Sequence, residues 1–204
     1  MHVGGMAAIN DDFAAVLTGE LPLFLAIIVL LGGLLLMLAF RSLLIPLTAA
    51  VMNLLAAGAT FGVVVAVFQW GWGADLLDVG TGPIEAFMPV FFLAILFGLS
   101  MDYQVFLVSR MREEWLHSND NTRAVTVGVA DTSRVITAAA AIMIVVFGSF
   151  VLGGDRFVAE IGLGLAFAIA VDAFVLRTTL VPALMHMFGR ANWWMPRWRS
   201  ISKI

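Results

Sequence analysis

Cysteine is absent from this chain of 204 residues, and charged residues are scarce. The lack of cysteine excludes disulfide bonds and metal sites with thiolate ligands. Charged residues make up 12% of the sequence and hydrophobic residues 62%. Because a soluble domain has about 25% charged residues, the composition predicts an integral membrane protein. The net charge of −3 gives no support for nucleic-acid binding.

The sequence also lacks the short motifs of hydrolases and nucleotide-driven pumps. It contains no Gly-rich phosphate loop ending in Lys-Ser or Lys-Thr, no Gly-x-Ser-x-Gly and no pair of histidines at metal-binding helical spacing. His117 and His186 have no metal-ligand companions in the sequence. We therefore expect no enzyme activity, no metal and no cofactor.

Five apolar segments are each long enough to cross the roughly 30 Å hydrocarbon core of a bilayer at about 1.5 Å per residue. They cover residues 21–40, 43–70, 84–110, 134–152 and 159–188. The sequence thus predicts an all-α protein of a cell membrane, with a five-helix transmembrane bundle over residues 21–188. Pro22 is expected at the start of the first helix. Residues 111–133 are expected to form a cytoplasmic loop that includes a short surface helix.

The basic residues are distributed unequally between the two ends of this bundle. Ten of the eleven fall on the side of the first-to-second connection, the third-to-fourth connection and the C-terminal tail: Arg41, Arg110, Arg112, Arg123, Arg134, Arg177, Arg190, Arg197, Arg199 and Lys203. Only Arg156 falls on the opposite side. The positive-inside rule then predicts an N-terminus outside the cell and residues 189–204 as a basic cytoplasmic tail. Residues 1–20 have no positively charged start and are not a secretory signal, so an upstream helix is expected.

An ionisable residue, Asp102, lies within the third apolar segment. A carboxylate there costs about 2.5–3.5 kcal/mol on insertion scales, so we expect it to be shielded, functional or both. Helical periodicity places Gly98, Asp102 and Phe106 on one side. Gly98 leaves space beside the carboxyl group, Phe106 can close the site, and the hydroxyl of Tyr103 can reach a neighbouring helix. The pattern predicts a site for an exchangeable proton, and the alternative is an aspartate neutralised by a fixed hydrogen bond.

Asp172 and Arg177 form a second polar site in the fifth segment. Five residues correspond to about 500° of α-helical rotation, so we expect the two side chains on different faces, each with a partner on another helix or in water. A structural ion pair or an anchor at the helix end is favoured over a secondary functional site. Asn53 and Thr60 are expected to cross-link helices.

Small residues predict where helices meet closely. Gly58 and Gly62 lie four residues apart in the second segment, and Gly162 and Ala166 lie four apart in the fifth. This spacing allows close backbone approach between membrane helices. Tight packing is the interpretation that we favour for both.

Several stretches of the chain together resemble the MMPL family of RND-superfamily transporters. The third segment contains FGLSMDYQVFLVSRMREEW, which resembles the Asp-Tyr helix of that family, and RVITAAAAIMIVVFGSF resembles the helix after it. Similar stretches occur at the start (VGGMAAINDDF), in the second helix (AFRSLLIPLTAAVMNLLAAGATFGVVVAVFQWGWG) and at the end (VDAFVLRTTLVPALMHMFGRANWWMPRW). The resemblance covers nearly the whole chain.

Family members typically have twelve membrane helices in two halves, each with a large extracytoplasmic porter domain. The resemblance therefore implies an RND-permease-like half: the last five helices, preceded over residues 1–20 by the end of a porter domain and a linker. It implies that Asp102 carries the proton and that Tyr103 is its hydrogen-bond partner in a proton relay, with Gly98 and Phe106 shaping the pocket. It also implies proton-driven export of lipids or other hydrophobic molecules.

The sequence contains one Asp-Tyr pair, whereas the family relay uses one from each half. We therefore expect the chain to act together with a missing N-terminal half, on the same longer polypeptide or as a separate subunit. The other expected partners are membrane lipids and a hydrophobic substrate. Two alternatives stay open: a five-helix module that binds lipids or sterols without transporting them, and a non-functional truncated fragment.

Overall fold

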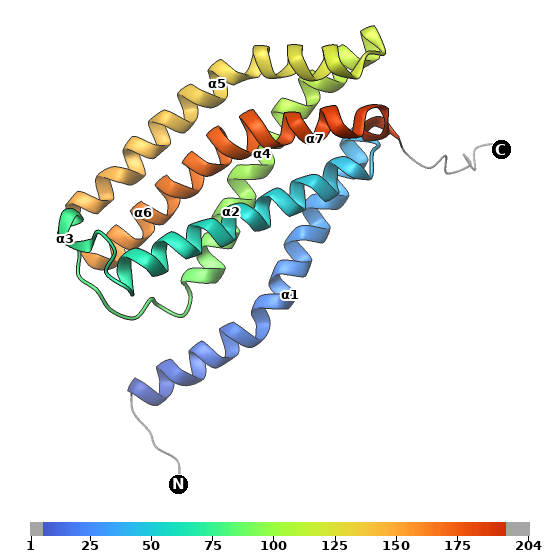
Figure 1. Ribbon diagram of the computed structural model, residues 1–204. Coiled ribbons are helices and arrows are strands. Elements are labelled where there is room, and N and C mark those ends of the chain that lie inside the picture. The colour runs from blue at the N-terminus through green and yellow to red at the C-terminus, as the bar shows by residue number, and fades with distance from the viewer. Residues whose placement is uncertain (1–5, 195–204) are drawn as a thin grey trace.

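The computed structural model describes residues 6–194, and the regular structure of this range is helical throughout (Figure 1). In chain order the elements are α1 (Met6–Phe40), α2 (Leu44–Phe68), α3 (Ala74–Leu77), α4 (Met88–Ser118), α5 (Asn121–Ser149), η1 (Phe150–Gly153), α6 (Arg156–Ala170), η2 (Val171–Leu180), α7 (Val181–Phe188) and η3 (Gly189–Trp193). Five helical stretches are long and apolar enough to cross a membrane. The predicted all-α fold with five spans is confirmed.

The connections between the spans lie at two opposite ends of the bundle (Figure 1). One end, which we call the Arg41 end, contains residues 41–43, residues 119–120 and η3. Residues 69–87 and 154–155 lie at the other, which we call the Asp155 end. The basic residues of the connections are at the Arg41 end, apart from Arg156. This separation agrees with the charge pattern on which the predicted orientation rests. Arg197, Arg199 and Lys203 lie outside the described residues.

Helices α1, α4 and α5 extend beyond their expected limits. Helix α1 begins at Met6 and passes through Pro22, which was expected at its start. Helix α4 continues to Ser118 and α5 begins at Asn121, so the expected loop 111–133 is helical except at residues 119 and 120. The short helix expected within this loop is the first part of α5. The break there is local, because Asn119 has φ 51° and the Asp120 carboxylate accepts hydrogen bonds from the Thr122 and Arg123 amides at 2.9 and 3.3 Å.

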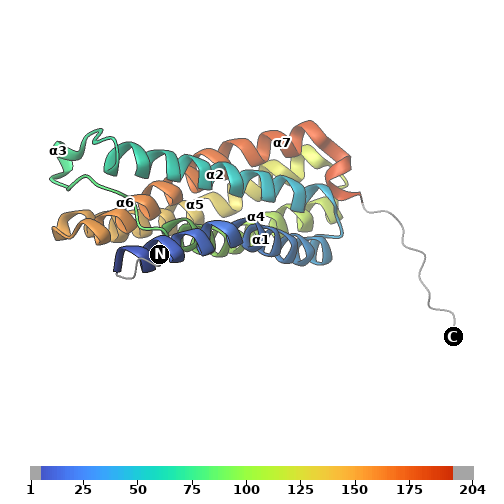
Figure 2. The same cartoon turned by 90° about the horizontal axis from the view of Figure 1, so that it is seen from below.

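Helix α4 is the central element of the bundle, since it packs against α1, α2, α5 and α6. In the view of Figure 2, α1 and α4 lie along one edge of the bundle and α2 along the opposite edge, with α5 and α6 between them. Three groups of buried apolar side chains fill the interior, one around Phe68 and Phe92, one around Met52 and Leu107, and one around Leu36. The core thus holds α4 on most of its circumference and leaves one strip of it uncovered.

Glycine allows close helix contacts at some of the predicted positions and not at others. A Cβ atom at Gly162 would lie 2.5 Å from the Phe147 carbonyl oxygen and 2.6 Å from the Phe150 Cβ, so α6 and α5 meet there as predicted. Gly58 and Gly62 are exposed, and a Cβ at either would have no neighbour within 4 Å. The prediction of close packing at Gly58 and Gly62 is wrong, because these residues lie on the side of α2 that faces away from the other four spans.

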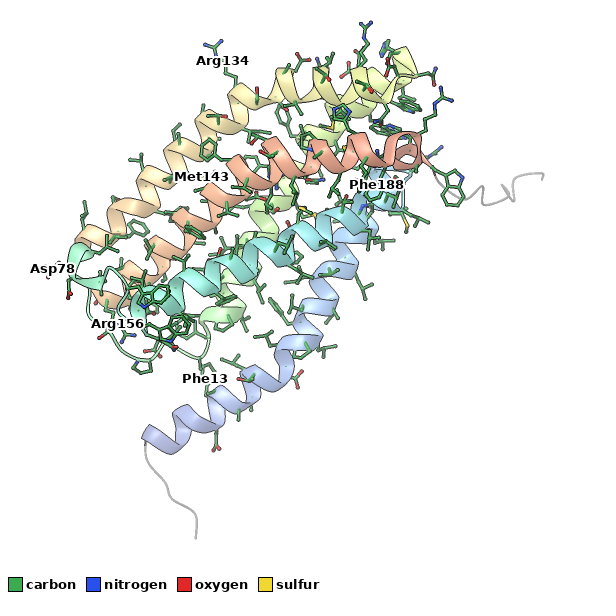
Figure 3. All side chains as sticks on the ribbon, in the orientation of Figure 1. Phe13, Asp78, Arg134, Met143, Arg156 and Phe188 are labelled. Carbon is green, nitrogen blue, oxygen red and sulfur yellow. The ribbon has the colours of Figure 1, made fainter. Side chains whose placement is uncertain are left out.

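Arg156 ties the long connection at the Asp155 end to α6 (Figure 3). Its Nη2 donates to the Pro83 carbonyl oxygen at 2.7 Å and to Glu160 Oε1 at 2.8 Å. A Cβ at Gly82 would lie 2.6 Å from Arg156 Nη1, so only glycine lets the guanidinium approach the loop this closely. Glu160 is 1% exposed, which makes Arg156 the counter-ion of a buried carboxylate.

Candidate functional site

Asp102 lies on the strip of α4 that the other described helices leave uncovered. Gly98, Asp102 and Phe106 are exposed, together with Val105 and Ser109 on the same strip. The face built from helical periodicity is therefore the outward face of the bundle. Within residues 6–194, Asp102 takes part in none of the ion pairs. A carboxyl group without an ion-pair partner among the described residues thus lies on the outward side of a central helix, open to whatever contacts that side.

Tyr103 faces inward, although it directly follows Asp102. Its hydroxyl donates to the sulfur of Met143 on α5, at 3.6 Å (Met143 is labelled in Figure 3). The guanidinium carbon of Arg177 lies over its ring, 5.3 Å from the centroid. The hydroxyl reaches a neighbouring helix, as expected from the sequence. The ring lies between the outward face of α4 and a buried polar cluster.

This cluster joins α2, α4 and the η2 segment in the interior of the bundle. It consists of five side chains that are at most 7% exposed: Asn53, Ser100, Gln104, Asp172 and Arg177. Arg177 Nε donates to Asp172 Oδ2 at 2.8 Å, and Nη2 donates to Ser100 Oγ at 2.7 Å and to the Ser100 carbonyl oxygen. Nη1 donates to Gln104 Oε1 at 3.4 Å. The charges of Asp172 and Arg177 cancel, and every nitrogen of the Arg177 guanidinium donates a hydrogen bond. A buried ion pair requires both.

Asn53 contributes the α2 side of the cluster. Ser100 Oγ donates to Asn53 Oδ1 and lies 3.3 Å from Asp172 Oδ1. Asn53 thereby links α2 to α4, as the sequence analysis expected of it. Thr60 does not do the same, because its hydroxyl donates to the Ala56 carbonyl oxygen of its own helix at 2.8 Å. The expected cross-link through Thr60 is wrong.

The expectation that Asp172 and Arg177 lie on different faces is also wrong, and the backbone gives the reason. Residues Val171–Leu180 form a π-helix, in which hydrogen bonds run from residue i to i+5. A π-helix brings residues five apart onto one face, whereas α-helical geometry would separate them by about 140°. Asp172 and Arg177 therefore pair with each other within one segment.

The family of the chain follows from its similarity to known proteins. The model of the MMPL family matches residues 1–204. The chain belongs to the MMPL family. It is accordingly a multi-pass membrane protein of a transporter family, consistent with its five apolar spans.

Individual MMPL relatives are similar over almost the whole chain. A probable transport protein, MmpL11 of Mycobacterium bovis, is 45% identical over 97% of this chain, which covers 20% of that protein. The membrane protein YdfJ of Bacillus subtilis is 43% identical over 96% of the chain and 27% of that protein. The trehalose monomycolate exporter MmpL3 of Mycolicibacterium smegmatis is 39% identical over 97% of the chain and 20% of that protein. The chain therefore spans between a fifth and about a quarter of the length of these relatives.

The MMPL chain brings the sequence-predicted residues into two places. Asp102, Gly98 and Phe106 lie together on the outward face, whereas Asn53, Asp172 and Arg177 meet inside the bundle. Sequence reasoning did not single out Ser100 and Gln104, which complete the inner cluster. The sequence did contain a pattern that indicates them, because two polar residues four apart in an apolar helix share one face.

Proposed function

We propose that this chain is a membrane-spanning part of a proton-driven MMPL transporter that exports lipids or other hydrophobic molecules. In this proposal Asp102 binds a proton from one side of the membrane and releases it to the other. The observation that carries the proposal is the unpaired Asp102 carboxyl group on the uncovered strip of α4, in a chain of a transporter family. A carboxylate that only stabilised the bundle would face its interior, as Asp172 does.

The outward position of Asp102 also supports a partner for this strip. A charged side chain facing lipid is costly, and a second membrane half packed against Gly98, Asp102 and Phe106 would shield it. We propose that this half, on the same polypeptide or on a separate subunit, completes the site. The relay then includes the Tyr103 hydroxyl, which turns from Met143 toward the proton-bearing group during the cycle.

The inner cluster has a structural role in the same proposal. Asn53, Asp172 and Arg177 anchor the last span and α2 to the inward side of α4, one turn or less from Asp102 along the helix. Because the cluster is buried and its charges are paired, we propose that it keeps α4 in place while the opposite face changes its protonation.

The substrate proposed is a lipid, because relatives of this chain are described as exporters of trehalose monomycolate and of mycolic acid-containing lipids. Another relative, MmpL11 of Mycobacterium tuberculosis, is described as a heme uptake protein. Both kinds of molecule are largely hydrophobic. Trehalose monomycolate and heme are therefore the two probes for a transport assay.

The decisive experiment replaces Asp102 by Asn in the complete transporter. Vesicles receive an imposed proton gradient, and movement of each probe is followed together with internal pH. We expect probe movement and proton uptake to fall to background, with unchanged protein level and thermal stability. Asp75→Asn, at an exposed position in the Asp155-end connection, is the matched control and retains transport. Transport by Asp102→Asn at the unchanged rate would exclude the proposed role.

A lipid-binding module is a second candidate, favoured by an apolar groove between α1 and α4. The groove has a volume of about 340 Å³ and is lined by Phe24, Ile28, Leu31, Gly32, Ala94, Phe97, Gly98 and Met101. Binding of a lipid probe that is equally strong in Asp102→Asn, without movement of any probe in either protein, would favour this function over transport.

A further inference from the structure

Arginine side chains in the described part of the chain fall into two groups. Four of them form ion pairs with carboxylates: Arg110, Arg123, Arg156 and Arg177. The other four, Arg41, Arg112, Arg134 and Arg190, have no carboxylate partner among the side chains that the structure describes. Of these, Arg41 and Arg112 lie close to each other at one end of the bundle. Glu113, the acid next to Arg112 in the sequence, is engaged by Arg110 at 2.5 Å. The charges of Arg41 and Arg112 are therefore uncompensated where they lie.

The backbone holds these two arginines close together. Arg112, near the end of α4, donates through Nη1 to the carbonyl oxygen of Ala39 in the last turn of α1. Arg41 follows two residues later, in the turn to α2, with φ 49°. Their positive charges act unfavourably on each other. Arg112 is partly buried and Arg41 is exposed. Since the Ala39 bond uses only one of the five N–H groups of Arg112, donors of both guanidinium groups remain to bind an anion.

The neighbours of the two arginines are apolar and exposed, as at a membrane interface. Leu38 is 64% exposed, Leu43 is 43% exposed, and Leu116, one helical turn after Arg112, is 67% exposed. A soluble anion gains nothing from such surroundings, whereas an amphiphile places its chains against the leucines and its charged group on the arginines. Anionic lipids attract basic residues by about 1 kcal/mol each near the surface, and a guanidinium can bind a phosphate through two parallel hydrogen bonds.

We propose that Arg41 and Arg112 form a binding site for the phosphate headgroup of an anionic phospholipid, in the leaflet at the Arg41 end of the bundle. The bound headgroup supplies the missing counter-charge and bridges the α1–α2 turn to the end of α4. The site is separate from Asp102 and from the inner cluster, and it does not depend on proton coupling.

The test measures lipid retention by the purified protein. The protein is reconstituted in vesicles of phosphatidylcholine and phosphatidylglycerol, extracted gently, and examined by native mass spectrometry for lipids that remain bound. We expect preferential retention of phosphatidylglycerol, and a decrease of about 10- to 30-fold in the double variant Arg41→Gln/Arg112→Gln. The control variant Arg134→Gln/Arg190→Gln removes the same charge from other exposed arginines, which form no ion pair among the side chains that the structure describes. It should retain phosphatidylglycerol like the unchanged protein.

Two further lipid-retention measurements test the proposal separately from protein folding and from binding of free phosphate. Arg41→Lys/Arg112→Lys preserves the charges, and it should keep most of the phosphatidylglycerol even if the Gln variant folds poorly. Excess inorganic phosphate should not displace the lipid, because it cannot use the apolar neighbours. Equal losses in the two Gln variants, no preference for phosphatidylglycerol, or displacement by inorganic phosphate would each overturn the proposal.

Discussion

The guanidinium carbon of Arg177 lies 5.3 Å from the centre of the Tyr103 ring, although Tyr103 directly follows the outward-facing Asp102. Two consecutive residues of α4 thus belong to different environments: an open face and a buried, charge-balanced cluster. Substitution of Asp102 should change transport, substitution of the charged pair in the cluster should change stability, and substitutions of Tyr103, which lies between them, should separate the two effects.

Replacing Arg177 by Gln should strongly destabilise the protein. The change leaves the Asp172 carboxylate buried without a counter-charge, which costs about 3–5 kcal/mol. The loss is measured as the change in free energy of unfolding in detergent. The double variant Asp172→Asn/Arg177→Gln removes both charges and should recover a large part of this loss. If Arg177→Gln alone were as stable as the unchanged protein, the pair would not be buried as described.

Replacing Tyr103 by Phe should separate the contribution of the hydroxyl group from that of the aromatic ring. The ring keeps its contact with Arg177, so the change in unfolding free energy should be about 0.5 kcal/mol or less. Tyr103→Leu also removes the cation–π contact and should cost about 1–2 kcal/mol more. Proton-coupled transport by the complete transporter should fall in both variants if the hydroxyl takes part in the relay. A Phe variant with full transport would remove Tyr103 from the relay.

Replacing Gly162 by Ala should loosen the contact between α5 and α6. The new Cβ would meet the Phe147 carbonyl oxygen at 2.5 Å, and such overpacking typically costs about 1–3 kcal/mol. Gly58→Ala is the matched control, because its Cβ would have no neighbour within 4 Å. Alanine is the better helix former by about 1 kcal/mol, so the control should be neutral or stabilising. The opposite order in thermal unfolding would contradict the packing described.

Replacing Arg156 by Gln should release the connection at the Asp155 end. The bonds to the Pro83 carbonyl and to Glu160 are lost together, so hydrogen exchange in residues 79–87 should become faster while exchange in α4 stays slow. Arg156→Lys keeps a charge for Glu160 but loses the fork that spans both acceptors, and should give an intermediate rate. Unchanged exchange in the Gln variant would show that the loop is held by other contacts.

The sequence alone predicted the parts of this structure that follow regular α-helical geometry. Five apolar runs of sufficient length gave five spans, and a period of 3.6 residues placed Gly98, Asp102 and Phe106 on one face of α4. These inferences succeeded because lipid favours hydrogen bonding within each helix, so that length and periodicity decide the outcome.

The remaining features depend on backbone geometry or tertiary contacts that a helical period does not contain. Asp172 and Arg177 share a face only because their segment is a π-helix. Gly58 and Gly62 have the spacing of a helix contact, but only the arrangement of α2 shows that its glycine face points away. Pro22 lies within α1, where it removes one amide donor and leaves the helix continuous, so its presence alone did not mark a boundary.

One connection between the described spans is much longer than the others. Residues 41–43 and 119–120 join their helices by tight turns at the Arg41 end, and residues 154–155 do the same at the Asp155 end. Only residues 69–87, which join α2 to α4 at the Asp155 end, form a long connection between the described spans. Tight turns hold α1 to α2, α4 to α5 and η1 to α6, so the long connection between α2 and α4 is the one that lets two consecutive spans separate. Rigid-body tilts of the α1–α2 pair against the other spans should therefore leave the turn at residues 41–43 nearly fixed and change the distance between the end of α2 and the start of α4 the most. A spectroscopic distance measurement between the end of α2 and the start of α4 would register motions that the same measurement at residues 41–43 would miss.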